Sequence, residues 1–236
     1  MQWAAGAAPA GTRDSPGRRP TLLCVHPHGI MCQGWGTLWL APETSGVTFC
    51  ASNALIASPF FRLLCRLTGK PSGCDKATMR RLMKKGGDLA LIPGGFHEAS
   101  IHSNKEDRVF LAKRKGFVKY ALQFGYALVP VFVFGESKTY ANVQGAWKFR
   151  LWLNSLGIPA ILPFGRWWLP LLPRSVGLHI VAGPPLPPPA GMEEGAAPGA
   201  LTPALVDAHH EAYVAALRKL YDEHAPAFGG NGLVVW

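Results

Sequence analysis

The chain has 236 residues, 48% of them apolar and 16% charged, and its formal net charge at neutral pH is +10. This composition excludes a disordered chain, and the length suits one sizeable domain. The positive charge favours an anionic partner, which is a nucleic acid, an anionic membrane surface or a phosphate-bearing cofactor. Because the sequence has no zinc-finger, basic-zipper or RNA-binding aromatic motif, we expect no nucleic-acid partner.

Residues 1–20 are rich in Gly, Ala, Pro and Arg, and we expect them to form a flexible leader. They lack the apolar core of a secretory signal. No window of about 18 uncharged apolar residues occurs, so the sequence predicts no transmembrane helix. We expect residues 21–236 to form a single domain.

Strand and helix patterns alternate through this domain. Short apolar runs predict strands at 21–25, 46–52, 88–95, 127–135 and from 178 onward. Apolar residues at spacings of three and four predict helices at 59–69, 74–87, 116–125 and 203–225. In the second of these helices, Asp75 is the expected N-cap and Gly86 the expected C-cap.

The run at 127–135 is continuously apolar rather than alternating. Such a run is typical of a strand in a sheet that is covered on both faces. The repeated strand–helix–strand units favour parallel pairing. The sequence therefore predicts an α/β fold, with a mostly parallel mixed sheet flanked by helices.

Three predicted strand ends carry residues suited to chemistry. In open α/β sheets, ligands gather at the carboxyl ends of the strands. The first end is His26-Pro27-His28-Gly29, the second is Pro93-Gly94-Gly95-Phe96-His97-Glu98, and the third is Gly135-Glu136-Ser137.

The first strand end pairs two imidazoles around a proline. Histidine is the natural general base near neutral pH. Pro27 stiffens the pair and Gly29 permits a sharp turn. His26 and His28 are two residues apart, so in an extended segment their rings point the same way, and one can serve as base while the other orients it. Two hydrogen-bonded turn histidines without a catalytic role are the alternative.

The second strand end offers hydrogen-bond donors and an acid. The main-chain N–H groups of Gly94 and Gly95 can bind a phosphate or stabilise an oxyanion. Glu98 can accept the N–H of a histidine ring and set its tautomer. A plain strand–turn–helix with a solvated Glu98 is the alternative.

Basic residues form two clusters along the chain. Each is either a solvated helix face or a site that neutralises the phosphates of a nucleotide-bearing cofactor. The clusters are Arg80, Arg81, Lys84 and Lys85, and Lys113, Arg114 and Lys115.

The segment Arg114–Glu136, RKGFVKYALQFGYALVPVFVFGE, resembles the long block shared by the type 2 diacylglycerol acyltransferase family. HPHG is similar to the active-site motif of that family, and PGGFHEAS resembles its Gly-Gly-x-x-Glu segment. The C-terminal HHEAYVAALRKLYDEHAPAFG resembles the closing helix. The resemblance covers Thr21 to about Gly229.

This resemblance implies a glycerolipid-acyltransferase-like fold and acyl transfer from coenzyme A to a lipid hydroxyl. Acyl-CoA is then a co-substrate, and neither a cofactor nor a metal is implied. The resemblance implies His28 as the general base, His26 as its neighbour and Glu98 as the orienting acid, since no aspartate follows either histidine by four residues. The implied substrate- and oxyanion-binding residues are Gly29, Gly94, Gly95, Arg114 and Lys119.

The resemblance further implies diacylglycerol as acceptor, with monoacylglycerol or a long-chain (wax) alcohol as alternatives. It implies a place at the endoplasmic reticulum membrane or lipid-droplet surface with the catalytic face cytoplasmic, and it permits a homo-oligomer. The apolar N-terminal hairpin usual in the family is not found in this sequence. We therefore expect the Trp-rich segment 147–172 to contact the membrane surface, with a buried core lobe as the alternative.

Two other functions remain open from the sequence. One is a non-catalytic lipid-binding protein at a membrane surface. The other is a metallohydrolase built on His26, His28 and His97.

Overall fold

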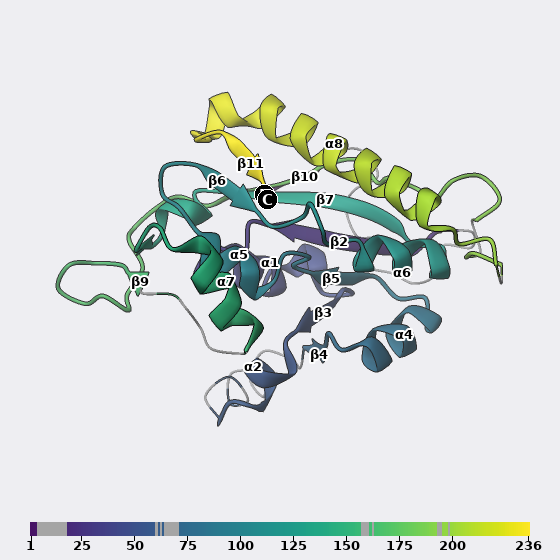
Figure 1. Cartoon of the computed structure of the whole chain (residues 1–236), viewed down its shortest axis with the longest axis horizontal. Coiled ribbons are helices and arrows are strands. Elements are labelled where there is room, and N and C mark those ends of the chain that lie inside the picture. The colour runs from purple at the N-terminus through teal and green to yellow at the C-terminus, as the bar shows by residue number, and fades with distance from the viewer. Residues whose placement is uncertain are drawn as a thin grey trace.

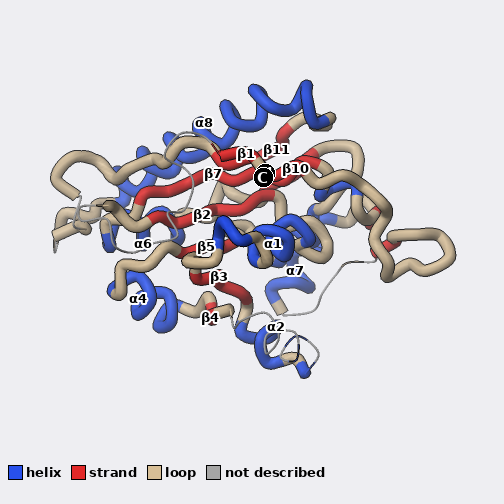
Figure 2. Tube along the Cα trace, turned by 180° about the vertical axis from the view of Figure 1, so that it is seen from behind, coloured by secondary structure: helices blue, strands red, loops and turns tan. Residues whose placement is uncertain are grey.

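The computed structural model describes residues 1–3, 18–59, 61, 63, 71–156, 161, 163–192, 195–197 and 199–236. Its centre is a seven-stranded sheet, seen in Figures 1 and 2. The spatial order is β1 (Gln2–Trp3), β10 (His179–Ala182), β7 (Ala127–Phe134), β2 (Thr21–His26), β5 (Leu89–Leu91), β3 (Thr48–Ala51) and β4 (Ser72–Gly73). All neighbours in this sheet are parallel except β7 and β10. The prediction of a mostly parallel mixed sheet is confirmed.

Two smaller pairings add to this sheet among the described residues. The strands β6 (Asp107–Val109) and β11 (Leu233–Val235) pair in parallel, and β8 (Ala141–Asn142) and β9 (Pro163–Phe164) pair antiparallel. The first pairing ties the end of the chain to its middle.

The predicted helices at 74–87, 116–125 and 203–225 are confirmed as α4 (Lys76–Lys84), α6 (Gly116–Phe124) and α8 (Pro203–Phe228). The Asp75 side chain accepts the first N–H groups of α4, and Gly125 ends α6 with φ of 69°. The helix predicted at 59–69 lies largely outside the described residues.

Four shorter helices and two 3-10 turns complete the described part of the chain. Measured over the described residues, every helix is too short or too polar to cross a lipid bilayer. The shorter elements are α1 (Gln33–Trp39), α2 (Asn53–Ala57), α5 (Phe96–Ile101), α7 (Trp147–Ser155), η1 (Pro42–Thr44) and η2 (Glu136–Lys138).

Both faces of the sheet are buried, as the continuous apolar strand predicted. In β2, Leu22 and Cys24 pack into the core that contains α4, α6 and α8, whereas Leu23 and Val25 pack into the core that contains α1. Figure 1 shows α8 lying along the sheet, and Figure 2 shows α1 in front of the opposite face. Side chains alternate along a strand, so the last residue of β2, His26, lies on the α8 side.

The predicted leader is held to the domain at the two places where it is described. Gln2 and Trp3 pair with β10, and Arg18 forms an ion pair with Asp88 at 2.8 Å. Residues 4–17 lie outside the described part. The domain boundary at residue 20 stays a prediction.

Candidate active site

The candidate site lies at one edge of the sheet, where β2, β5 and β7 end. His28 is in the turn after β2, Glu98 is in α5 after β5, and Glu136 begins the 3-10 turn after β7. Because β2 pairs in parallel with both β5 and β7, the three carboxyl ends are adjacent. The structure therefore brings together the three strand ends that the sequence singled out.

Glu98 is the centre of this arrangement, although its side chain is only 1% exposed. One carboxylate oxygen, Oε2, accepts the main-chain N–H of His28 at 2.7 Å, and the other, Oε1, accepts that of Phe110 at 2.9 Å. Both hydrogen bonds of the carboxylate therefore come from the backbone, whereas the predicted bond was from a histidine ring. Pro27 has no N–H, so His28 supplies the first main-chain donor after the strand.

His26 faces the interior of the domain. Its ring is fully buried, with Nε2 2.9 Å from the hydroxyl of Tyr213 in α8 and Nδ1 3.5 Å from Oε1 of Glu98. Burial raises the pKa of Tyr213 well above its usual value, so the phenol stays neutral and can donate to the ring. The ring therefore lies in the interior beside Glu98, and its Nδ1 forms no hydrogen bond with the described residues.

His28 faces a different element, in contrast to the expectation that both rings share one direction. Its ring is half-buried, with Nδ1 3.0 Å from the carbonyl oxygen of Gly29. Sγ of Cys32, at the start of α1, lies almost equally close to both ring nitrogens, 3.3 Å from Nδ1 and 3.2 Å from Nε2. We assign the proton to Nδ1 from its carbonyl contact, which leaves Nε2 as the acceptor.

The electrostatics of His28 suit a general base. Burial lowers its pKa, whereas the Gly29 carbonyl and the charge of Glu98 raise the pKa by smaller amounts. The net result is a pKa below the usual value, so the ring is neutral at neutral pH and can take up a proton.

Two of the predicted glycines allow close approach of side chains to the backbone. Gly29 has φ of 62°, and a Cβ built there would collide with the Glu136 carboxylate. A Cβ at Gly94 would collide with the Glu98 carboxylate. Any larger residue would push these acids out of position, while the role of both N–H groups as oxyanion donors stays a prediction.

The other predicted binding residues are Gly95, Arg114 and Lys119, and each has contacts or surroundings of its own. The Gly95 N–H donates to the Ile92 carbonyl at 3.2 Å, so this donor is already in use. Arg114 is half-buried, and its Nη2 lies 2.5 Å from Nδ1 of His97. Lys119 is exposed on α6, where it lines a separate pocket.

The described residues contain no group of three or more His, Cys, Asp and Glu side chains placed to hold a metal ion. His97 stacks on Phe110, with ring centroids 5.1 Å apart, and contacts Arg114. It therefore does not join His26 and His28 as the metal alternative required.

Glu136 is a site residue to which the sequence assigned no role. It is 1% exposed, and its carboxylate accepts the N–H groups of Gln33 at 3.1 Å and Gly34 at 2.7 Å in the first turn of α1. These bonds, together with its contact with Gly29, join the end of β7 to the turn that carries His28. The signal in the sequence was an acid directly after the Phe134-Gly135 strand end.

We expect the unfolding free energy of Glu136→Gln, relative to that of the wild type, to be higher at pH 8 than at pH 4.5. Burial raises the Glu136 pKa from 4.5 to about 7, against the two N–H bonds, which lower it. Between these values the folded protein keeps a proton that the unfolded chain releases, so wild-type stability falls as pH rises through this window. The shift corresponds to about 3 kcal/mol.

Denaturant unfolding of both proteins at pH 4.5, 6 and 8 measures this effect. The glutamine keeps the shape of the side chain and one acceptor oxygen, so its other effects on stability should not depend on pH. A difference in unfolding free energy that stays constant over the three pH values would contradict the raised pKa.

Comparison with a solved structure defines the class of fold. The crystal structure of the 1-acyl-sn-glycerophosphate acyltransferase from Thermotoga maritima matches this chain with a TM-score of 0.50 at 15% sequence identity. The match covers 89% of this chain and 68% of that one. The fold is therefore that of a glycerolipid acyltransferase.

Sequence comparison then gives the family. The family model described as diacylglycerol acyltransferase matches residues 10–234. Acyl-CoA wax alcohol acyltransferase 2 of Mus musculus is 32% identical, over 92% of this chain and 69% of that protein. Diacylglycerol O-acyltransferase 2 of Danio rerio is 30% identical, over 90% of this chain and 63% of that protein. The chain belongs to the diacylglycerol acyltransferase family.

Proposed function

We propose that this chain transfers an acyl group from acyl-CoA to the hydroxyl of diacylglycerol, with His28 as the general base. Family membership supports acyl transfer, and the relatives include proteins named as acyltransferases for wax alcohols, 2-acylglycerol and diacylglycerol. The observation that carries the proposal is the half-buried, neutral His28 ring at the strand edge, whose turn is fixed by the buried Glu98.

The reaction needs two proton transfers, one from the lipid hydroxyl to His28 and one from His28 to the coenzyme A thiolate. The lipid hydroxyl attacks the thioester carbonyl while Nε2 of His28 takes its proton, and the Cys32 S–H turns aside as the hydroxyl binds. The tetrahedral intermediate then collapses, the C–S bond breaks, and the His28 imidazolium returns the proton to the coenzyme A thiolate. The Gly29 and Gly94 N–H groups are the proposed donors to the oxyanion.

Glu98 supports this cycle without touching the substrate. Its negative charge raises the pKa of the His28 ring and so favours the imidazolium that forms during attack. The His26 ring lies beside the carboxylate on the interior side, with Nδ1 3.5 Å from Oε1, and the Tyr213 hydroxyl contacts Nε2 of that ring. Glu98 and His26 are therefore positioning residues.

A membrane surface is the proposed source of the lipid acceptor. Trp167 is 93% exposed, and Trp168, Leu171, Phe149 and Trp152 are also exposed, so a buried core lobe does not describe these side chains. Exposed aromatic residues favour the membrane interface. A location at the endoplasmic reticulum or lipid droplets stays a prediction.

An acceptor panel tests the proposed substrate. Labelled acyl-CoA is supplied with vesicles that contain 1,2-diacylglycerol, 2-monoacylglycerol or a long-chain alcohol, and the labelled ester is measured. We expect kcat/KM to be highest for diacylglycerol. A higher value for another acceptor would assign the chain to that specificity, and binding of all three lipids without any ester would favour the non-catalytic alternative.

A further inference from the structure

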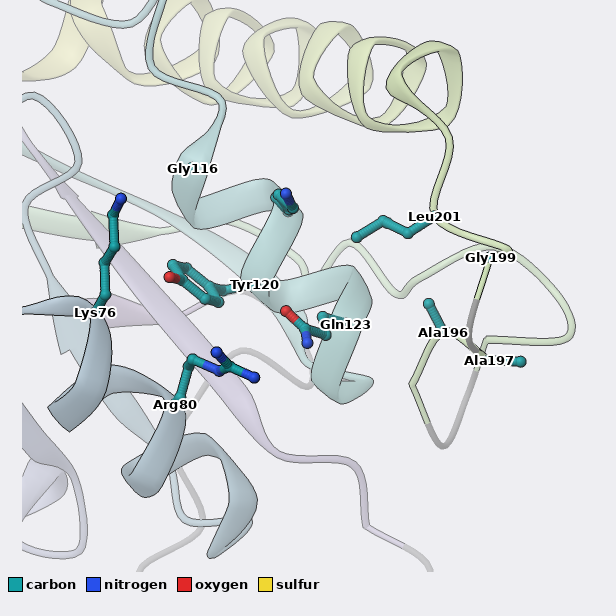
Figure 3. Close-up of a pocket in the computed structure, with 10 residues that line it drawn as sticks. Lys76, Arg80, Gly116, Tyr120, Gln123, Ala196, Ala197, Gly199 and Leu201 are labelled. Carbon is teal, nitrogen blue, oxygen red and sulfur yellow. The ribbon is translucent and has the colours of Figure 1, made fainter.

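A basic pocket of about 520 Å³ lies between α4, α6 and the loop before α8 (Figure 3). We propose that it binds the phosphate groups at the nucleotide end of acyl-CoA, an inference that rests on the proposed function. The lining residues are Lys76, Arg80, Gly116, Lys119, Tyr120, Gln123, Ala196, Ala197, Gly199 and Leu201.

The charge of the lining residues is the first argument. Lys76, Arg80 and Lys119 are cations, and no acid lines the pocket. Over the described part of the chain, these three form no ion pair, whereas neighbouring Lys115 binds Asp207 at 2.7 Å. An anion with more than one phosphate can neutralise several of these cations at once.

The placement of the cations on α4 is the second argument. Lys76 and Arg80 are four residues apart on α4, so they share one helix face. Figure 3 shows Arg80 reaching from α4 toward Tyr120 and Gln123 on α6. Like charges at this spacing repel each other, and an anion between the helices removes that repulsion. Both the charge of the lining residues and their placement therefore favour an anionic ligand.

The start of α6 adds to the positive electrostatic potential of the pocket. Gly116 lines the pocket and is the first residue of α6, whose first turn has no acidic residue and no side-chain cap. The N-terminus of a helix is electropositive and attracts phosphate. The half-buried Tyr120 and Gln123 offer a flat ring and an amide to a nucleobase. A nucleotide therefore suits the pocket better than a simple anion.

The pocket is connected to the candidate active site through the chain that precedes α6. Arg114 is two residues before Gly116, and it contacts His97, which is adjacent to Glu98. The chain reverses at Gly125 between α6 and β7, so the start of α6 points toward the sheet edge that carries His28. The start of α6 and His28 are therefore placed at the same edge of the sheet, and the proposal is that the linear arm of acyl-CoA extends between the pocket and this edge.

Binding of adenosine 3′,5′-bisphosphate, measured by titration calorimetry, tests the proposal without any turnover. We expect the double variant Arg80→Gln/Lys119→Gln to bind at least tenfold more weakly than the wild type. The matched control is Arg81→Gln/Lys84→Gln, which removes the same charge from exposed positions on α4 that do not line the pocket. The control should bind like the wild type, and equal binding by both double variants would overturn the proposal.

Two further binding measurements identify which kind of phosphate-bearing ligand the pocket takes. Vesicles with phosphatidic acid replace the nucleotide in one, and inorganic phosphate replaces it in the other. Pocket-dependent binding of the vesicles but not of the bisphosphate would overturn the nucleotide assignment in favour of a lipid headgroup. Inorganic phosphate that binds as tightly as the bisphosphate would also overturn it.

Kinetics link the pocket to the reaction. The KM of the pocket variant for acyl-CoA should be about tenfold higher than that of the wild type. This increase should be smaller with an acyl-pantetheine, which has no nucleotide. An equal increase with both thioesters would contradict a nucleotide site. Nucleotide binding without any ester formation would instead leave this site in place and overturn the proposed function, so the two failures are distinguishable.

Discussion

His28→Ala should lower the rate of acyl transfer by about 10²–10⁴ while leaving the protein folded. The variant loses the ring nitrogen that we propose accepts the proton of the lipid hydroxyl. It keeps the main-chain N–H of residue 28, and this N–H, not the ring, donates to Glu98 at 2.7 Å. The turn should therefore persist, and initial rates of labelled ester formation together with thermal unfolding measure the two effects separately.

His224→Ala is the matched control for loss of an imidazole. His224 lies on α8, and its ring contacts the Leu220 carbonyl and Phe228 within that helix. We expect this variant to keep nearly the wild-type rate. Near-normal turnover by His28→Ala in the same assay would remove His28 from the mechanism.

Replacing Glu98 should affect both stability and activity. Glu98→Ala leaves the partly buried N–H groups of His28 and Phe110 without their acceptor. Each such donor costs about 1–3 kcal/mol, so the unfolding free energy should fall by about 2–6 kcal/mol. Glu98→Gln keeps one acceptor oxygen and should be less destabilised, but it removes the charge that favours the imidazolium.

The pH dependence of the glutamine variant separates positioning from a purely structural role. The charge of Glu98 raises the pKa of His28, so its removal lowers that pKa further. The base form then survives to lower pH, and the acid limb of kcat/KM should move to lower pH as the maximum rate falls. An unchanged acid limb and unchanged stability in both Glu98 variants would contradict the assignment.

Much of the fold is encoded locally and could be predicted. The strand β7 is buried at all eight positions, which its continuous apolar run indicated. Asp75 and Gly125 mark helix ends by their own chemistry. Elements fixed by distant partners escaped prediction, and β6 forms its ladder with β11, which lies more than 120 residues away along the chain.

In the candidate site, too, some features could be predicted from local sequence and others depend on residues far away along the chain. The three strand ends could be found from the sequence because topology alone brings them to one edge. The different orientations of the two histidine rings could not, since His26 contacts Tyr213, 187 residues away, and the His28 turn is held by the backbone bond to Glu98. Lys119 was expected at the substrate by resemblance, and its neighbours Lys76 and Arg80 come from a helix that no local pattern connects to it.

The role of His28 in acyl transfer is tested most directly by measuring both products of the reaction, coenzyme A and the ester, in one assay. Acyl-CoA is mixed with vesicles of 1,2-diacylglycerol, and the free coenzyme A thiol and the new ester are measured together for the wild type and for His28→Ala. One thiol should appear for each ester in the wild type, and both should be lost in the variant. Thiol release without ester, or equal ester formation by both proteins, would contradict acyl transfer with His28 as the general base.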